Sequence, residues 1–169
     1  MWFRCGLAVR QVGNMARPRL LVDVAGLAFT PPHKALRQVL NRLLGLQIDL
    51  APSYAIAARD ARLNDLAIRF RGMRPPRFPT VFEALVNGIA CQQLSLEAGL
   101  TLLNRLVATH GQAPLRRLGA CNVFPQPAQL GHATVKSLRA LGFSNNKSTT
   151  IIEIASAVDR QDVRLDQLD

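Results

Sequence analysis

The sequence predicts a mainly helical protein with a short β-like segment at its N-terminus. From residue 31 onward, apolar residues recur every three to four positions, which is the period of an α-helix. Proline and glycine divide this pattern into segments, several of which begin with serine or threonine. The 169 residues are 49% hydrophobic but only 5% aromatic, which predicts an aliphatic core of single-domain size.

Residues 1–30 differ from the rest, because RLLVDVAGLAF contains short β-like runs punctuated by glycine. We expect strand or irregular structure there. The chain is therefore predicted to have two parts: residues 1–30, the remnant of an N-terminal β-containing domain or an irregular segment, and residues 31–169, a helical domain.

Helix boundaries follow from the capping residues. Prolines at 31 and 32 open a helix over His33–Leu44 that Gly45 ends. A second helical pattern runs from about Ser53 to Phe70, and the proline-rich stretch RGMRPPRFP follows as a stiff connector. The later predicted boundaries are helix starts at Thr80, Ser95 and Ser144, helix ends near Gly111, Leu141 and Val158, and a left-handed cap at Gly142.

The charge balance favours a polyanionic partner. The chain has 21 basic and 11 acidic residues, a formal net charge of +10, and nucleic acid is the commonest partner of such proteins. An arginine-rich proteome without any partner is the alternative. The connector carries four arginines and no acid, which suits phosphate contacts, although a solvated connector has the same composition. These arginines are Arg69, Arg71, Arg74 and Arg77.

Lys147 stands near the start of the last predicted helix, where its charge opposes the helix dipole. A phosphate bound at that helix end would explain the lysine, and a freely solvated side chain is the alternative.

Several functional classes are excluded by the sequence. The cysteines, Cys5, Cys91 and Cys121, are odd in number and scattered, so they give neither a disulfide framework nor a metal spacing. We expect no metal, no cofactor and a reducing, cytoplasmic setting. The N-terminus lacks the apolar run of a signal peptide, and no run approaches membrane-span length.

The segment TVFEALVNGIACQQLS ends a predicted helix on two glutamines. Phe82, Leu85 and Ile89 share one helical face, and the same rhythm places Gln92 on that buried stripe. Gln93 is about 100° further round and points to solvent. We expect Gln92 to pin the following turn and Gln93 to project from it. Two ordinary polar residues at a helix end are the alternative.

Three ordered stretches resemble the bacterial DNA-3-methyladenine glycosylase II family, within the helix-hairpin-helix DNA glycosylase superfamily. They are PPRFPTVFEALVNGIACQQLSLEAGLTLLNRLVATHG, FPQPAQL and LRALGFSNNKSTTIIEIASAV, and the resemblance covers residues 43–158. It implies a helical bundle of that superfamily and a bacterial, cytoplasmic, nucleoid-associated enzyme of base excision repair. Such an enzyme binds double-stranded DNA with alkylated or abasic sites, flips the alkylated base and hydrolyses its N-glycosidic bond.

The resemblance also implies site residues. In the family, a side chain at the turn after the first core helix is wedged into the stack that the flipped base leaves. That position corresponds to Gln93 or Leu94, with Gln92 fixing the turn. Arg74 and Arg77 would flank the same groove and, with Lys147, bind the DNA backbone.

The sequence departs from the family after the last helix. The hairpin and the catalytic aspartate expected there do not appear, so no catalytic residue is transferred. The chain thus resembles a C-terminally truncated, partial glycosylase domain that on its own lacks catalysis. A non-enzymatic DNA-binding remnant and a helical protein-interaction module are the alternatives.

Overall fold

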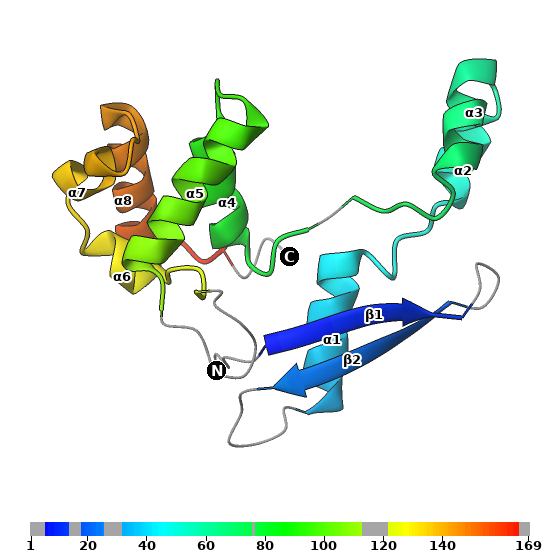
Figure 1. Ribbon diagram of the computed structural model, residues 1–169, viewed down its shortest axis with the longest axis horizontal. Coiled ribbons are helices and arrows are strands. Elements are labelled where there is room, and N and C mark those ends of the chain that lie inside the picture. Colours follow the sequence, from blue (N-terminus) through cyan, green and yellow to red (C-terminus); the bar gives the residue numbers. More distant parts are fainter. Residues whose placement is uncertain (1–5, 14–17, 26–31, 76, 113–121, 166–169) are drawn as a thin grey trace. The chain divides into compact units, whose positions relative to one another are not determined.

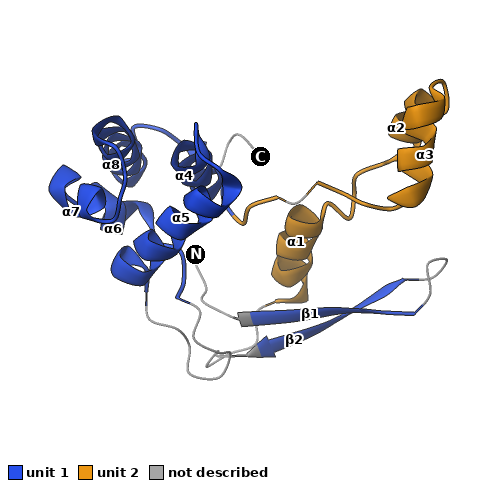
Figure 2. Cartoon of the chain, turned by 45° about the horizontal axis from the view of Figure 1, so that its top comes forward, with its two compact units in different colours: residues 1–31, 80–169 blue, residues 32–79 orange. Residues whose placement is uncertain are grey.

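A computed structural model describes residues 6–13, 18–25, 32–75, 77–112 and 122–165 (Figure 1). The described part is mainly helical with one small sheet, which confirms the predicted fold class. The chain divides into two compact units, one of residues 1–31 with 80–169 and one of residues 32–79 (Figure 2). The predicted division into two domains near residue 30 stays a prediction.

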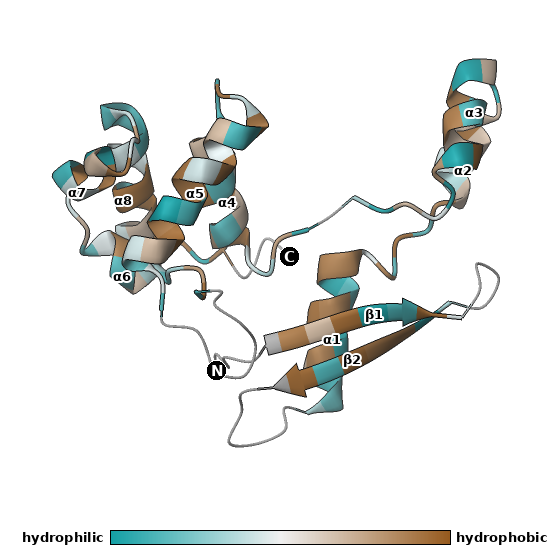
Figure 3. Cartoon of the chain, in the orientation of Figure 1, coloured by the Kyte–Doolittle hydropathy of each residue, from teal (hydrophilic) through white to brown (hydrophobic). Residues whose placement is uncertain are grey.

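The N-terminal segment forms an antiparallel hairpin of β1 (Gly6–Val12) and β2 (Arg19–Ala25). Its register pairs Leu7 with Val24 and Val12 with Arg19. Hydrophobic positions dominate both strands (Figure 3). The strand expected within residues 1–30 is therefore present as a hairpin, in which β2 covers the first seven residues of RLLVDVAGLAF and β1 precedes that stretch.

The smaller unit contains three helices: α1 (His33–Leu44), α2 (Ala51–Ala57) and α3 (Ala61–Arg69). Helix α1 has the predicted bounds, and Gly45 ends it in the left-handed conformation with φ 59°.

The prediction of one continuous helix over residues 53–70 is wrong. Asp60 adopts an extended conformation and starts α3 as its N-cap. Its carboxylate accepts hydrogen bonds from the amides of Arg62 and Leu63 at 2.8 and 3.1 Å. An aspartate in this position satisfies amides that a helix start leaves free, so it favours two helices over one.

The larger unit gathers five helices: α4 (Val81–Cys91), α5 (Leu96–His110), α6 (Pro127–Gly131), α7 (Val135–Ala140) and α8 (Asn145–Asp159). The predicted N-caps Thr80, Ser95 and Ser144 each accept a hydrogen bond from their helix. The predicted helix ending at Leu141 is two short helices, because Thr134 caps a new start by accepting from the Ser137 amide at 3.1 Å. No described helix has both the length and the apolar character that a membrane crossing requires.

The core of this unit is mainly aliphatic, as the composition predicts, and includes two phenylalanines, Phe82 and Phe143. Helix α4 packs on α5 and α8, and α6 and α7 pack on α8. Among the described residues, the largest hydrophobic side chains with no more than 2% exposure are Val86, Leu106, Pro125, Leu130, Leu138 and Ile151.

The buried face of α4 differs by one position from the predicted stripe. Phe82, Val86 and Ala90 are buried, whereas Leu85 is 38% exposed. Phe82, Val86 and Ala90 are spaced four positions apart. They, rather than Leu85, face the neighbouring helices α5 and α8. Gln92 lies outside this buried face and is exposed.

Glu83 in the first turn of α4 gives a pH-dependent prediction. Burial raises the pKa of its carboxyl above the usual 4.5. Folding therefore favours the protonated form, and this stabilisation is complete below pH 4.5 and is lost as the pH rises through the folded-state pKa. We expect Glu83→Gln to remove that loss, so that the variant is more stable than the parent at neutral pH.

Urea unfolding between about pH 4 and pH 8 measures the effect. Glu97→Gln is the matched control, because Glu97 lies in the first turn of α5 and is exposed. Parallel stability curves for the parent and Glu83→Gln would contradict the prediction.

Candidate functional site

The turn from Gln92 to Ser95 joins α4 to α5 within the larger unit (Figure 1). Gln92 ends α4 with φ −56° and ψ 133°, and Ser95 begins α5 by accepting a hydrogen bond from the Ala98 amide at 3.2 Å. Gln92, Gln93 and Leu94 are all exposed. The turn therefore presents a polar and an apolar side chain to solvent, side by side in the sequence.

Gln93 has φ 55°, in the left-handed region. Residues with a Cβ atom pay about 1–2 kcal/mol to enter this region, which glycine enters freely. Non-glycine residues held in such conformations concentrate at functional sites. The conformation at Gln93 thus marks the turn, and the sequence pattern alone gave no sign of it.

Gln92 does not lie on the buried face. Because the buried stripe runs through Phe82, Val86 and Ala90, the expectation of a half-buried Gln92 is wrong. Its side-chain amide makes no hydrogen bond to any described residue, while its backbone carbonyl accepts one from Lys147. The predicted turn-fixing role of Gln92 stays a prediction, and the contact seen at this residue is made by the backbone.

Lys147 reaches from the first turn of α8 to the end of α4. Its Nζ donates to the carbonyl oxygens of Ala90 at 2.9 Å and Gln92 at 2.7 Å. The interpretation of a freely solvated lysine is therefore wrong. The predicted contact of Lys147 with the DNA backbone stays a prediction.

Helices α4 and α5 approach closely just behind the turn. A Cβ atom on Gly99 would lie 2.6 Å from the Cys91 Sγ and 3.2 Å from the Cys91 Cα. A glycine is therefore required at this crossing, and it fixes the angle at which the two helices enter the turn.

An open groove of about 470 Å³ runs beside the turn, along α5. Its walls are Leu94, Ser95, Glu97, Ala98, Thr101, Leu102, Arg105 and Gly142. Arg105 donates from Nη1 to the Leu141 carbonyl at 3.1 Å, so it ties this wall to the α7–α8 turn. The groove wall thus carries one carboxylate, from Glu97, and one guanidinium, from Arg105.

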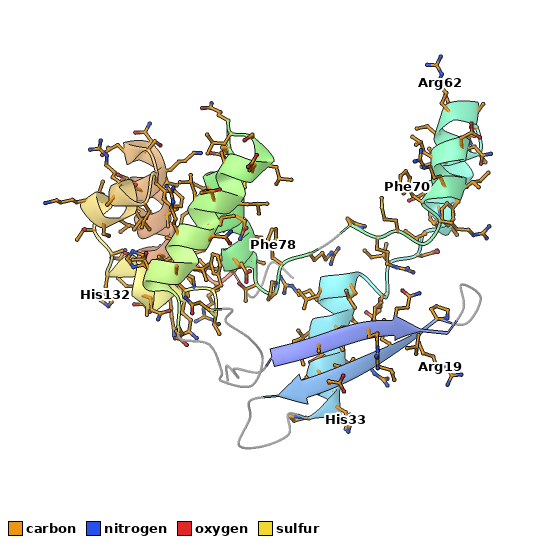
Figure 4. All side chains as sticks on the ribbon, viewed as in Figure 1. Arg19, His33, Arg62, Phe70, Phe78 and His132 are labelled. Atoms are coloured by element: carbon orange, nitrogen blue, oxygen red, sulfur yellow. The ribbon has the colours of Figure 1, made fainter. Side chains whose placement is uncertain are left out.

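The connector arginines all lie in the smaller unit. The guanidinium groups of some contact that unit itself, and those of the others have no partner in the described part of the chain. Arg74 donates to the carbonyls of Gly72 at 3.2 Å and Ile48 at 3.4 Å, so its guanidinium holds the connector. Arg69 lies over the Phe70 ring, 5.5 Å from its centroid, at the end of α3 (Figure 4 labels Phe70).

Arg71 and Arg77 are exposed, and their guanidinium groups have no partner among the described residues. These two are free to meet an anion.

Tyr54 packs locally, because its hydroxyl accepts a hydrogen bond from the Gly72 amide at 2.7 Å. The carboxylates near the end of α8, Glu153, Asp159 and Asp162, are exposed, and Asp162 pairs with Arg160 at 2.9 Å. Cys5 and Cys121 lie outside the described residues. Within the described ranges, no three His, Cys, Asp or Glu side chains gather where a metal ion could bind.

Comparison with known proteins finds a family whose model resembles the segment that contains this turn. Residues 86–165 match the model of the HhH-GPD superfamily base excision DNA repair protein. A DNA-3-methyladenine glycosylase of Bacillus subtilis (strain 168) is 30% identical over 116 residues, which are 69% of this chain and 38% of that protein.

Solved structures agree on the fold. The 3-methyladenine DNA-glycosylase from Archaeoglobus fulgidus is 28% identical, with a TM-score of 0.72 over 88% of this chain and 51% of its own. The 8-oxoguanine glycosylase/lyase of Clostridium acetobutylicum, in complex with double-stranded DNA, has a TM-score of 0.72 over 95% of this chain and 51% of its own, and at 15% identity it shows the fold alone.

The chain thus spans about half the length of these two solved structures, and less of the Bacillus relative. The matched residues include the α4–α5 turn and helices α5 to α8. Residues 86–165 of this chain are accordingly similar to the HhH-GPD superfamily of base excision DNA repair proteins.

Proposed function

We propose that this chain acts in base excision repair of alkylated DNA, as a relative of DNA-3-methyladenine glycosylase II. The observation that carries the proposal is the exposed α4–α5 turn, with its left-handed Gln93, inside the segment that matches the repair family. The relatives at 28% and 30% identity both act, by their names, on 3-methyladenine, which supports an alkylated base as the substrate class.

Alkylation places positive charge on a base, which makes the base a better leaving group. Flipping that base costs a few kcal/mol, and a wedge that fills the vacated stack offsets part of the cost. Leu94 is apolar and 44% exposed, which suits contact with stacked bases. The Gln93 amide carries both donors and an acceptor for the edge of the orphaned base.

These 169 residues by themselves are proposed to bind DNA without hydrolysis. The described carboxylates of α8 and its end, Glu153, Asp159 and Asp162, are exposed and do not line the groove. None of them is held in the half-buried setting that a general base or nucleophile usually has.

The test is to incubate the chain with methylated duplex DNA and measure both abasic-site formation and binding to an abasic duplex. Binding without base release is the expected result. Base release would assign a catalyst among the α8 carboxylates and overturn the proposed lack of hydrolysis. Absence of both binding and release would overturn the proposed function.

Gln93→Ala tests the wedge. We expect it to weaken binding to an abasic duplex about ten-fold, or about 1.4 kcal/mol, and to leave binding to intact duplex nearly unchanged. Competition binding with the two duplexes measures the ratio. Gln161→Ala is the matched control, because Gln161 is also exposed and has φ 62° at the end of α8. An equal loss on both duplexes would contradict the wedge.

A helical protein-interaction module is the second candidate. The observation in its favour is the apolar surface of α2 and α3, in which no residue is buried and Ile56 and Ile68 are 63% and 64% exposed. The salt dependence of DNA binding, treated in the Discussion, separates the two functions.

A further inference from the structure

We propose that Lys147 is a positioning residue that holds the wedge residue Gln93 in its left-handed conformation. The inference rests on the proposed function of the α4–α5 turn and assigns a role in it to a side chain from α8. In this proposal the main role of Lys147 is to position the turn, and not to contact a phosphate.

The contact acts directly on Gln93. The Gln92 carbonyl, 2.7 Å from Lys147 Nζ, belongs to the same planar peptide unit as the Gln93 amide. The torsions on either side of that plane are ψ 133° at Gln92 and φ 55° at Gln93. An ammonium group that fixes the plane therefore fixes the positions of the Gln93 N and Cα atoms, from which the left-handed φ directs the side chain.

The end of α4 needs an external donor. It lacks the glycine that commonly satisfies the last carbonyls of a helix. The turn's own backbone bonds are long, with Gln92 N to Ile89 O and Leu94 N to Cys91 O both at 3.4 Å. Charge-assisted bonds are shorter and stronger, and the two made by Lys147 are 2.9 and 2.7 Å.

The backbone of Lys147 is held in place by hydrogen bonds in the first turn of α8. Ser144 accepts a hydrogen bond from the Lys147 amide at 3.3 Å, and the fully buried Ser148 donates to the Ser144 carbonyl at 2.9 Å. A cation in the first turn of α8 is unfavourable for the dipole of α8 and favourable for the C-terminal end of α4. The position of Lys147 is therefore explained by the turn that it reaches.

Lys147→Met separates positioning from phosphate binding. Lys136→Met on α7 is the matched control, because Lys136 is exposed and its ammonium has no partner among the described residues. Affinities for abasic and intact duplexes are measured over a salt series. We expect Lys147→Met to lower the abasic-to-intact affinity ratio about ten-fold, with the same salt slope as the control. An unchanged ratio with a slope lowered by about 0.9 more than the control would show a phosphate contact and overturn the inference.

Two further variants keep the inference falsifiable. In a Gln93→Ala background, Lys147→Met should lower the ratio no further, and an additive loss would overturn the coupling. Lys147→Arg keeps a charge that can still meet a phosphate but alters the donor geometry at the two carbonyls. We expect it to lower the ratio at an unchanged salt slope, so it replaces Lys147→Met if that variant does not fold. Full retention of the ratio in Lys147→Arg would count against positioning.

The outcomes for the parent chain distinguish this inference from the proposed function. A parent chain with no preference for the abasic duplex would overturn the proposed function itself. A parent preference that survives in Lys147→Met would overturn only the role of the lysine.

Discussion

Leu106→Ala is expected to lower the free energy of unfolding of the larger unit by about 2–5 kcal/mol. Leu106 lies on α5, is 0% exposed, and packs in the cluster that includes Val86 and Leu130. Removing three buried carbon atoms loses their transfer free energy and leaves a cavity that the neighbouring helices fill only in part. Since whole domains are stable by only about 5–15 kcal/mol, this loss is a large fraction of the total.

Urea unfolding followed by circular dichroism measures the change. Leu100→Ala is the control, because Leu100 lies on the same helix and is 48% exposed. We expect it to cost less than about 1 kcal/mol. Similar losses for the two variants would mean that the cluster around Leu106 is not the core of this unit.

Binding of the chain to duplex DNA is expected to weaken steeply with salt. If the chain neutralises about four phosphates, its affinity should fall about a hundred-fold between 50 and 200 mM salt, since each neutralised phosphate adds about 0.9 to the slope. Equilibrium binding over a salt series measures this slope. A flat dependence would contradict the arginine interpretation and favour a protein partner.

Arg77→Ala and Arg74→Ala show how much each arginine contributes to the salt dependence of DNA binding. The Arg77 guanidinium is exposed and has no partner among the described residues, so its loss should lower the slope by about 0.9 without changing stability. Arg74 donates to two carbonyls of its own unit, so its loss should destabilise that unit and change the slope less. The reverse pattern would mean that Arg74 is the phosphate contact, a role that the sequence resemblance implies for both arginines.

The local signals in the sequence predicted most of the fold. Thr80, Ser95 and Ser144 begin their helices as expected, because an N-cap acts within three residues and can be read locally. The break at Asp60 could have been predicted by the same rule, but the apolar periodicity across it favoured one helix.

The sequence led to the α4–α5 turn as a candidate site, and the site residues themselves stay a prediction. The location of the site at the two glutamines followed from the resemblance. The hydrogen bonds from Lys147 to the carbonyls at the end of α4 could not be predicted from the sequence. The bond from Lys147 to Ala90 joins residues 57 positions apart, and no periodicity carries that information. The one-position error in the buried stripe has the same origin, because the positions of α5 and α8, rather than the α4 sequence, decide which face is covered.

The absence of any buried residue in α2 and α3 has a consequence for folding. Helices without buried side chains gain little from tertiary packing, and short helices of 7 and 9 residues are marginal on their own. This segment is expected to open with a small free energy while the aliphatic core of α4 to α8 stays closed. The chain would then denature in more than one step, and a single Tm would describe only the unit that contains the wedge turn.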